Sequence, residues 1–239
     1  MAISANITLT SAAGDLVTNA LSLSDNTTLT KAGTSTALAN TSGLARKTTA
    51  DLLEYTLFYA DDYTGSKAHK LYIKNTSATP AEFFTLSNGD ETLGLMYAGD
   101  WALIPWAAVN GTKQVISLTL ALNWATADTI TFDGVTMTGA AAATTTSWVD
   151  YIKTFSFPNW TAVELSEHVI TFTAKRSDNL ENVLLGDMAA VTTGSIVATT
   201  TGNGTATVAQ VTEGVASAND IKITPGQAAN TVEYMLLHE

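Results

Sequence analysis

The side chains best suited to metal binding or proton transfer are three histidines, His69, His168 and His238. A helical zinc site of the His-Glu-x-x-His type places two histidines one turn apart on the same face. The three histidines here are much further apart, and the motif does not occur in the sequence. Glu164 and Glu167 precede His168, but on an extended chain Glu164 and His168 lie two pleats apart. We therefore interpret this group as a polar strand edge and predict no metal site.

Acidic pairs and glycine-rich turns lack the context that catalysis or phosphate binding requires. In each of the pairs Asp61-Asp62 and Asp90-Glu91, neighbouring side chains face opposite ways on an extended chain, so neither pair can act on one substrate. Gly202-Asn203-Gly204 lies between two predicted strands instead of opening a helix, whose backbone amides would bind phosphate. The sequence has no Gly-x-Ser-x-Gly motif and no cysteine nucleophile. We expect a non-enzymatic protein without a cofactor.

One group of aromatic residues has two possible uses. The group consists of Tyr72, Phe83, Phe84, Tyr97, Trp101 and Trp106. Aligned on a surface, such rings could bind a carbohydrate, but large aromatic side chains more commonly fill the core of a β-sandwich. The sequence favours core packing and leaves the carbohydrate surface as an alternative.

Charge and composition restrict the partners of the chain. Its 239 residues carry a net charge of −11, and only 14% of them are charged, compared with about 25% in typical soluble domains. Nucleic-acid binding needs clustered Lys and Arg, whereas the basic residues here are scattered, so we expect no direct contact with nucleic acid. No apolar run has the length of a membrane helix and no signal peptide is recognisable, so we expect synthesis in a cytoplasm and no membrane association.

The elements that would position these residues are mainly short strands. Apolar and polar residues alternate in a series of segments separated by turn signals such as Asn88-Gly89. These segments are residues 55–59, 70–75, 82–86, 93–97 and 101–106. Two later strands, 220–224 and 231–237, should join the same sheet, because an isolated two-stranded hairpin is marginal in water. The pattern predicts an antiparallel β-sandwich or jelly-roll-like domain.

A segment with a different pattern separates these two groups of strands. Trp148, Ile152 and Phe155 have helical spacing and predict a helix over residues 144–157, ended by Pro158. A second short helix is predicted at 179–188. The predicted strands are residues 114–123, a hairpin over 128–137 that turns at Asp133-Gly134, residues 169–174, and a strand pair over 195–211.

These patterns predict a mainly β chain in three parts. Residues 1–45 form an N-terminal arm of short strands. Residues 46–112 plus 218–239 form a discontinuous β-sandwich domain, and residues 113–217 form a small α+β domain inserted into it.

Several strand sequences also resemble a known family. They are Lys-Leu-Tyr-Ile-Lys-Asn-Thr-Ser at residues 70–77, Leu-Met-Tyr-Ala-Gly-Asp-Trp-Ala-Leu-Ile-Pro-Trp at 95–106, and the two C-terminal stretches 220–225 and 232–239. They resemble paralogous virion proteins of tailed bacteriophages, particularly large marine cyanophages. In shorter members of that family the tryptophan-containing stretch runs almost directly into the C-terminal pair, which implies an insertion in this chain. The middle segment resembles, more weakly, small α+β modules of phage tail and capsid proteins.

The resemblance implies a virion structural protein that is assembled in the host cytoplasm. Its expected partners are further copies of itself and other virion proteins, foremost the major capsid protein. The expected role is a capsid decoration or cement protein, in which the arm and the inserted domain make the contacts. The alternatives are a tail component, such as a tube, baseplate or fibre-attachment protein, and a carbohydrate-binding adhesion module. The resemblance rests on hydrophobic strand sequences, so it assigns no functional residue.

Overall fold

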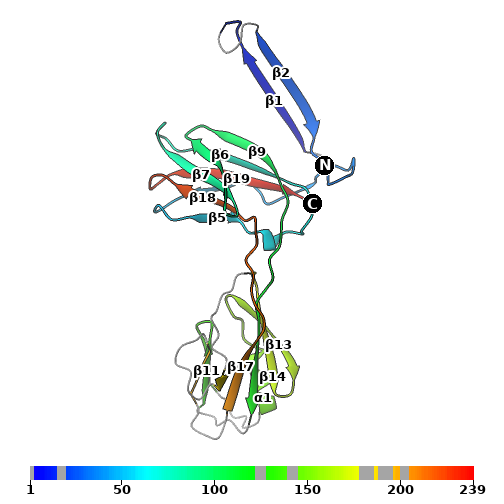
Figure 1. Cartoon of the computed structure of the whole chain (residues 1–239), viewed down its shortest axis with the longest axis vertical. Coiled ribbons are helices and arrows are strands. Elements are labelled where there is room, and N and C mark those ends of the chain that lie inside the picture. Colours follow the sequence, from blue (N-terminus) through cyan, green and yellow to red (C-terminus); the bar gives the residue numbers. More distant parts are fainter. Residues whose placement is uncertain are drawn as a thin grey trace. The chain divides into compact units, whose positions relative to one another are not determined.

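The structure is a computed structural model that describes residues 3–14, 20–121, 128–138, 145–177, 186–187, 196–199 and 205–239. The described residues are mainly β, with antiparallel sheets and one α-helix (Figure 1), which confirms the predicted fold class. Contacts divide the chain into two compact units. The outer unit is Met1–Val109 with Asn219–Glu239, and the inserted unit is Asn110–Ala218.

Two sheets of the outer unit form a sandwich. The first has the order β5 (Tyr55–Phe58), β18 (Ile221–Pro225), β7 (Phe83–Asn88) and β8 (Glu91–Tyr97). The second has the order β3 (Asn40–Thr41), β19 (Thr231–His238), β6 (His69–Asn75) and β9 (Trp101–Trp106), and β4 (Ala45–Thr48) also pairs with β19. A short 3-10 helix, Ala60–Asp62, follows β5.

The late strands β18 and β19 join the earlier ones, as predicted, but they are not partners of each other. β18 pairs with β5 and β7 in one sheet, and β19 pairs with β6 and with β3 and β4 in the other. Alternate residues of both strands are apolar because they supply the shared core between the sheets. Ile221, Ile223, Val232 and Leu236 pack there with residues such as Leu71 of β6.

The N-terminal arm is a hairpin of two strands, β1 (Ser4–Ser11) and β2 (Leu21–Thr28), which pair in antiparallel register over their whole length. At its base, Leu29 donates a backbone hydrogen bond to the Ile3 carbonyl, which extends the pairing of the two strands by one step. Leu29 and Leu38 pack there against Leu237 of β19. The end of the predicted arm, residues 40–45, joins the sandwich through β3 and the start of β4.

The inserted unit contains two further sheets. One has the order β13 (Trp160–Ser166), β14 (Val169–Ala174), β10 (Val115–Ala121), β17 (Thr205–Thr212) and β15 (Gly186–Asp187). The other has the order β12 (Val135–Thr138), β11 (Thr129–Phe132) and β16 (Ile196–Thr199). An aromatic core that includes Trp148, Phe132, Phe157, Trp160 and Phe172 fills this unit.

Some predictions for this segment hold and others fail. The helix α1 covers Thr145–Ile152 and buries Trp148 and Ile152, but it ends before Pro158. The strand pair predicted over 195–211 is wrong, because β16 pairs with β11 whereas β17 pairs with β10. Most of the helix predicted at 179–188 lies outside the described residues, as does the turn at 202–204, and the described part, Gly186–Asp187, is a strand. Because α1 is the single described helix of the unit, the predicted α+β character is not confirmed.

Candidate assembly surface

Two of the three histidines lie close together in the outer unit, which their spacing in the sequence did not predict. His69 on β6 is fully buried, and its ring centroid lies 6.3 Å from that of His238 on β19. Tyr63 and Trp106 complete this ring cluster, with centroids 5.7 and 5.5 Å from that of His69. Burial lowers the pKa of His69, and a weaker interaction with the Thr64 backbone opposes the shift. We therefore interpret the cluster as part of the core, packed around a histidine that stays neutral near pH 7.

The remaining candidates for chemistry do not gather into a site. Asp61 and Asp62 lie on the short 3-10 helix, Asp90 lies in the tight turn between β7 and β8, and Glu91 is the first residue of β8. Glu164 forms an ion pair with Lys153 at 2.5 Å. Among the described residues, no group of three or more His, Cys, Asp and Glu side chains is arranged to hold a metal ion.

The aromatic group identified in the sequence divides between core and surface. Phe84 and Trp106 are buried, and Trp106 donates a hydrogen bond from Nε1 to the Asn219 carbonyl at 2.8 Å. Tyr97 and Trp101 are exposed at the end of β8 and the start of β9. The other two members, Tyr72 and Phe83, are half-buried. Core packing therefore accounts for Phe84 and Trp106, and Tyr97 and Trp101 are the most exposed pair for a surface role.

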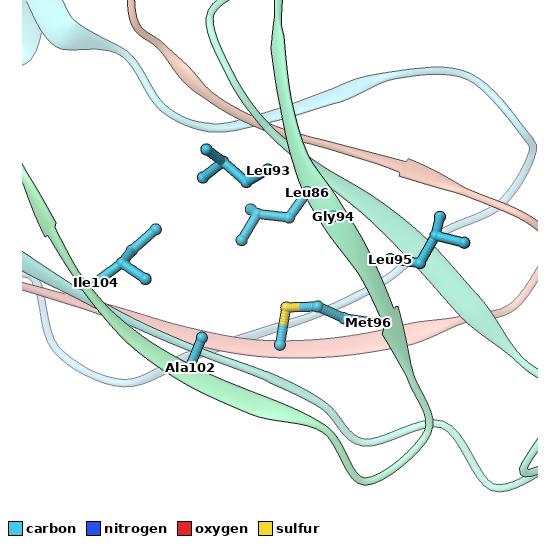
Figure 2. Close-up of a pocket in the computed structure, with 7 residues that line it drawn as sticks. All are labelled: Leu86, Leu93, Gly94, Leu95, Met96, Ala102 and Ile104. Atoms are coloured by element: carbon cyan, nitrogen blue, oxygen red, sulfur yellow. The ribbon is translucent and has the colours of Figure 1, made fainter.

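An apolar groove lies beside these exposed rings, between the edge strands β8 and β9 of the two sheets. It has a volume of about 200 Å³, and all of its lining residues are uncharged and apolar. They are Leu86, Leu93, Gly94, Leu95, Met96, Ala102 and Ile104. Figure 2 shows the side chains of Leu93, Leu86 and Met96 turned toward Ala102 and Ile104 across the opening, whereas Leu95 points to the other side of β8.

A β-bulge explains why Leu93 faces the groove. In a regular strand Leu93 and Met96 would face opposite sides, because their spacing is odd. However, Leu86 pairs with Gly94 and Ser87 pairs with Thr92, so Leu93 is an extra residue on β8. The bulge turns this leucine toward the space between the sheets, where it is still 51% exposed.

Asn75 links β8 to the sheet that contains β9. Its side-chain nitrogen donates to the carbonyls of Met96 at 2.9 Å and Glu82 at 3.2 Å, and its side-chain oxygen accepts from the Ser77 amide at 2.9 Å. Asn75 ends β6 in one sheet, and Met96 belongs to β8 in the other. The two sheets are therefore linked by buried hydrogen bonds at this end of the sandwich.

Both strands along the groove have a free edge in the described structure. β8 pairs only with β7, and β9 pairs only with β6. The outward backbone amides and carbonyls of an edge strand form a template for another strand. The groove therefore combines apolar side chains with backbone groups that can accept a further strand.

The N-terminal hairpin presents the complementary type of surface. On one face, Ile7, Leu9, Leu21 and Leu23 are 37%, 50%, 39% and 52% exposed, and Leu9 lies opposite Leu23. The other face carries only Ser, Thr and Asn along the whole length of β1 and β2. A hairpin with one apolar face is expected to bury that face against another surface.

The inserted unit has a second exposed apolar region on its edge strand β13. Val163 and Leu165 are 56% and 68% exposed. Val163 pairs with Thr171 of β14, and Leu165 is an extra residue where the pairing register shifts. It is a weaker candidate, because it is not hollowed and has no partner surface of matching shape.

Comparison of the chain with protein-family models, curated protein sequences and solved structures gave no significant match. None of the described helices is both long and apolar enough to span a membrane. The groove between β8 and β9, the apolar face of the hairpin and the resemblance of the strand sequences are the features that bear on function.

Proposed function

We propose that this chain is a virion structural protein of a tailed bacteriophage and that it acts as a capsid decoration protein. The observation that carries the proposal is the N-terminal hairpin, whose leucine and isoleucine side chains stay exposed on one face. Exposed apolar surface of this kind is characteristic of proteins that complete their burial in an assembly. The resemblance of residues 70–77 and 95–106 to phage virion proteins supports the choice of assembly.

The mechanism of such a protein is many weak contacts made at once. Each copy buries a small apolar area, and binding at one point raises the local concentration of the remaining contact groups. Because ligands that bind only the assembled state shift its stability by mass action, many copies stabilise a shell without any chemical step. The low charged fraction of 14% suits a chain that places much of its surface against neighbours.

The net charge of −11 supports a place on the outside of a capsid. Packaged DNA repels acidic surfaces, so a protein that lies against it would be expected to carry basic residues. An outer position keeps this chain away from the DNA, and its hairpin strands, which contain the single charged residue Asp25, can approach other subunits at little electrostatic cost.

Locating the chain in purified particles tests the proposal. We expect an electron cryomicroscopy reconstruction to show it on the outer capsid surface, and quantitative mass spectrometry to find it in many copies on heads that lack tails. Its absence from purified particles would contradict the virion role as a whole.

Two outcomes would replace the decoration role with another function. Copies that are few and lost with the tail would assign the chain to a tube, baseplate or fibre attachment. The free edges of β8 and β9 would then pair between subunits of a ring. Retention on a glycan array that is abolished by Trp101→Ala would assign a carbohydrate-binding role to the exposed Tyr97 and Trp101.

A further inference from the structure

We propose that the apolar face of the β1–β2 hairpin of one copy docks into the β8–β9 groove of a second copy. This inference rests on the self-assembly part of the proposed function and names the two surfaces that meet. The hairpin supplies Ile7, Leu9, Leu21 and Leu23, and the groove supplies the apolar residues around Leu93.

The hairpin needs a covering surface on one side only. An isolated two-stranded hairpin is marginal in water, because it orders two strands without burying a core. Here every polar residue of one face can stay in water, while Leu9 and Leu23 form an exposed pair at the centre of the other. A docking site that covers the leucine face alone satisfies both sides of the hairpin.

The groove fits side chains better than a small molecule. Its volume of about 200 Å³ is below the range of roughly 300–1,000 Å³ that is typical of small-molecule sites. Its lining offers no charged group to orient a ligand. Leucine side chains from a docked strand would fill it, and the free backbone edges of β8 and β9 allow strand addition beside it.

Charge favours a second copy of this chain as the partner. The chain carries a net charge of −11, so most of its surface repels another copy. The strands β1 and β2 contain one charged residue, Asp25, and the groove lining contains none. Asp25 pairs with Ile7 and therefore lies on the leucine face. The two surfaces together carry this one charge, so they can meet with little repulsion.

The fold also separates the hairpin from the groove of its own copy. The hairpin base is fixed where Leu29 and Leu38 pack on Leu237 of β19. The groove is bordered by β9, and β6 lies between β19 and β9 in that sheet. The hairpin is a separate two-stranded sheet whose base packs on β19, whereas the groove lies beyond β6 at β9. Because the two surfaces differ, the contact is of the head-to-tail type, which closes into a dimer or a ring when it is reciprocated around an axis.

Mixing two defective variants of the full-length chain tests this arrangement. The first variant, Leu9→Ser with Leu23→Ser, loses the apolar hairpin face but keeps the groove. The second variant, Leu93→Ser, loses part of the groove but keeps the hairpin. In sedimentation equilibrium we expect each variant alone to associate at least about tenfold more weakly than the unchanged chain, since each loses buried leucine surface. The equimolar mixture should recover association, because the hairpin of the second variant can dock into the groove of the first.

Two matched controls show that the effect depends on the face. Leu52→Ser changes the same residue type on the surface of the outer unit, where Leu52 is 57% exposed; Leu52 belongs neither to the groove lining nor to the hairpin strands. Thr8→Ala with Ser24→Ala alters the polar face of the hairpin, where the two hydroxyls lie 3.5 Å apart. Both controls should associate like the unchanged chain, and all variants should keep its urea-unfolding midpoint within experimental error.

Each other result overturns the proposal in a distinguishable way. If the mixture associates no better than its components, the hairpin does not dock into the groove of another copy. If only the hairpin variant is defective, hairpins pack on each other. If Leu52→Ser is as defective as Leu93→Ser, the loss of association does not depend on the groove. If all variants associate normally, the docking is wrong while self-assembly, and with it the proposed function, stands. If the unchanged chain stays monomeric at every concentration, the docking is wrong. The localisation of the chain in purified particles then tests the virion role separately.

Discussion

Substitution of Asn75 by alanine is expected to destabilise the outer unit more than any other change of a single polar side chain at this end of the sandwich. Asn75 is 0% exposed. Its side chain donates to the carbonyls of Met96 and Glu82 and accepts from the Ser77 amide. Alanine removes all three hydrogen bonds and leaves the Met96 carbonyl buried without its donor.

The magnitude follows from these contacts. A hydrogen bond contributes about 0.5–1.5 kcal/mol net, and a buried group left without its partner costs about 1–3 kcal/mol. The bond to Met96 is buried, whereas the bonds to Glu82 and Ser77 are partly buried, so water can replace them in part. We expect the free energy of unfolding to fall by about 3 kcal/mol in total.

Urea unfolding followed by tryptophan fluorescence measures this loss. With a slope of about 2 kcal/mol per molar urea, the midpoint should fall by about 1.5 M. Hydrogen–deuterium exchange of peptides from β6 and β8 assigns the transition to the outer unit. The matched control is Asn26→Ala on the exposed strand β2, which should change stability by less than about 0.5 kcal/mol.

Asn75→Asp tests the direction of the hydrogen bonds. Aspartate keeps an acceptor for the Ser77 amide but places a carboxylate oxygen against the Met96 carbonyl, so at neutral pH it should destabilise at least as much as alanine. A loss below about 1 kcal/mol for alanine, or normal stability of the aspartate variant, would refute the role assigned to Asn75.

Three further changes test other parts of the structure. Burial lowers the pKa of His69, so as the pH falls the unfolded chain binds a proton before the folded chain does. The stability that neutral His69 contributes is therefore complete above about pH 6.5 and is lost as the pH falls from there toward the folded-state pKa. With His69→Phe the urea midpoint should depend less on pH between about 7.5 and 5, and a pH profile equal to that of the unchanged chain would exclude His69 as its source. Gly111→Ala should lower the free energy of unfolding of the inserted unit by about 1–3 kcal/mol, because the added Cβ would lie 2.1 Å from the Val215 carbonyl oxygen. An unchanged thermal midpoint would show that the backbone does not approach Gly111 this closely. Asp133 has a positive φ of 50° and accepts hydrogen bonds from Asn159. Asp133→Ala should therefore lower the thermal midpoint, and Asp133→Asn should lower it less. Equal losses would show that the backbone geometry does not depend on this side chain.

Local patterns predicted the strands of the outer unit well. The buried alternation of Leu71 and Ile73 on β6, and the turn at Asn88-Gly89, each follow from properties of a few neighbouring residues. Asp133 and Gly134 both have positive φ values, as their turn requires. The mainly β class could be predicted from the sequence, and is confirmed, because it depends only on such local signals.

Partner choice between strands is not local, and there the sequence was less informative. β16 and β17 are close in the chain and both suit a sheet, yet β16 pairs with β11 and β17 pairs with β10. The strand β13 was not predicted, although Trp160 and Ala162 pack on the core and alternate with exposed Thr161 and Val163.

The candidate surface was also only partly visible in the sequence. The alternation of Ile7 and Leu9 with polar residues indicated an arm of short strands. The groove was not predicted, since an extra residue in β8 turns Leu93 inward against the regular alternation. His69 and His238 come together only because β6 and β19 are neighbours in the folded sheet.

The internal positions of β18 and β19 determine the order in which the protein can mature during synthesis. Residues 110–218 emerge from the ribosome as a complete unit with their own core. The earlier strands β5 to β9 must wait, because the middle strand of each sheet is made only with residues 221–238. The groove beside β8 and β9 is therefore expected to form last, after residues 221–238 have joined their two sheets.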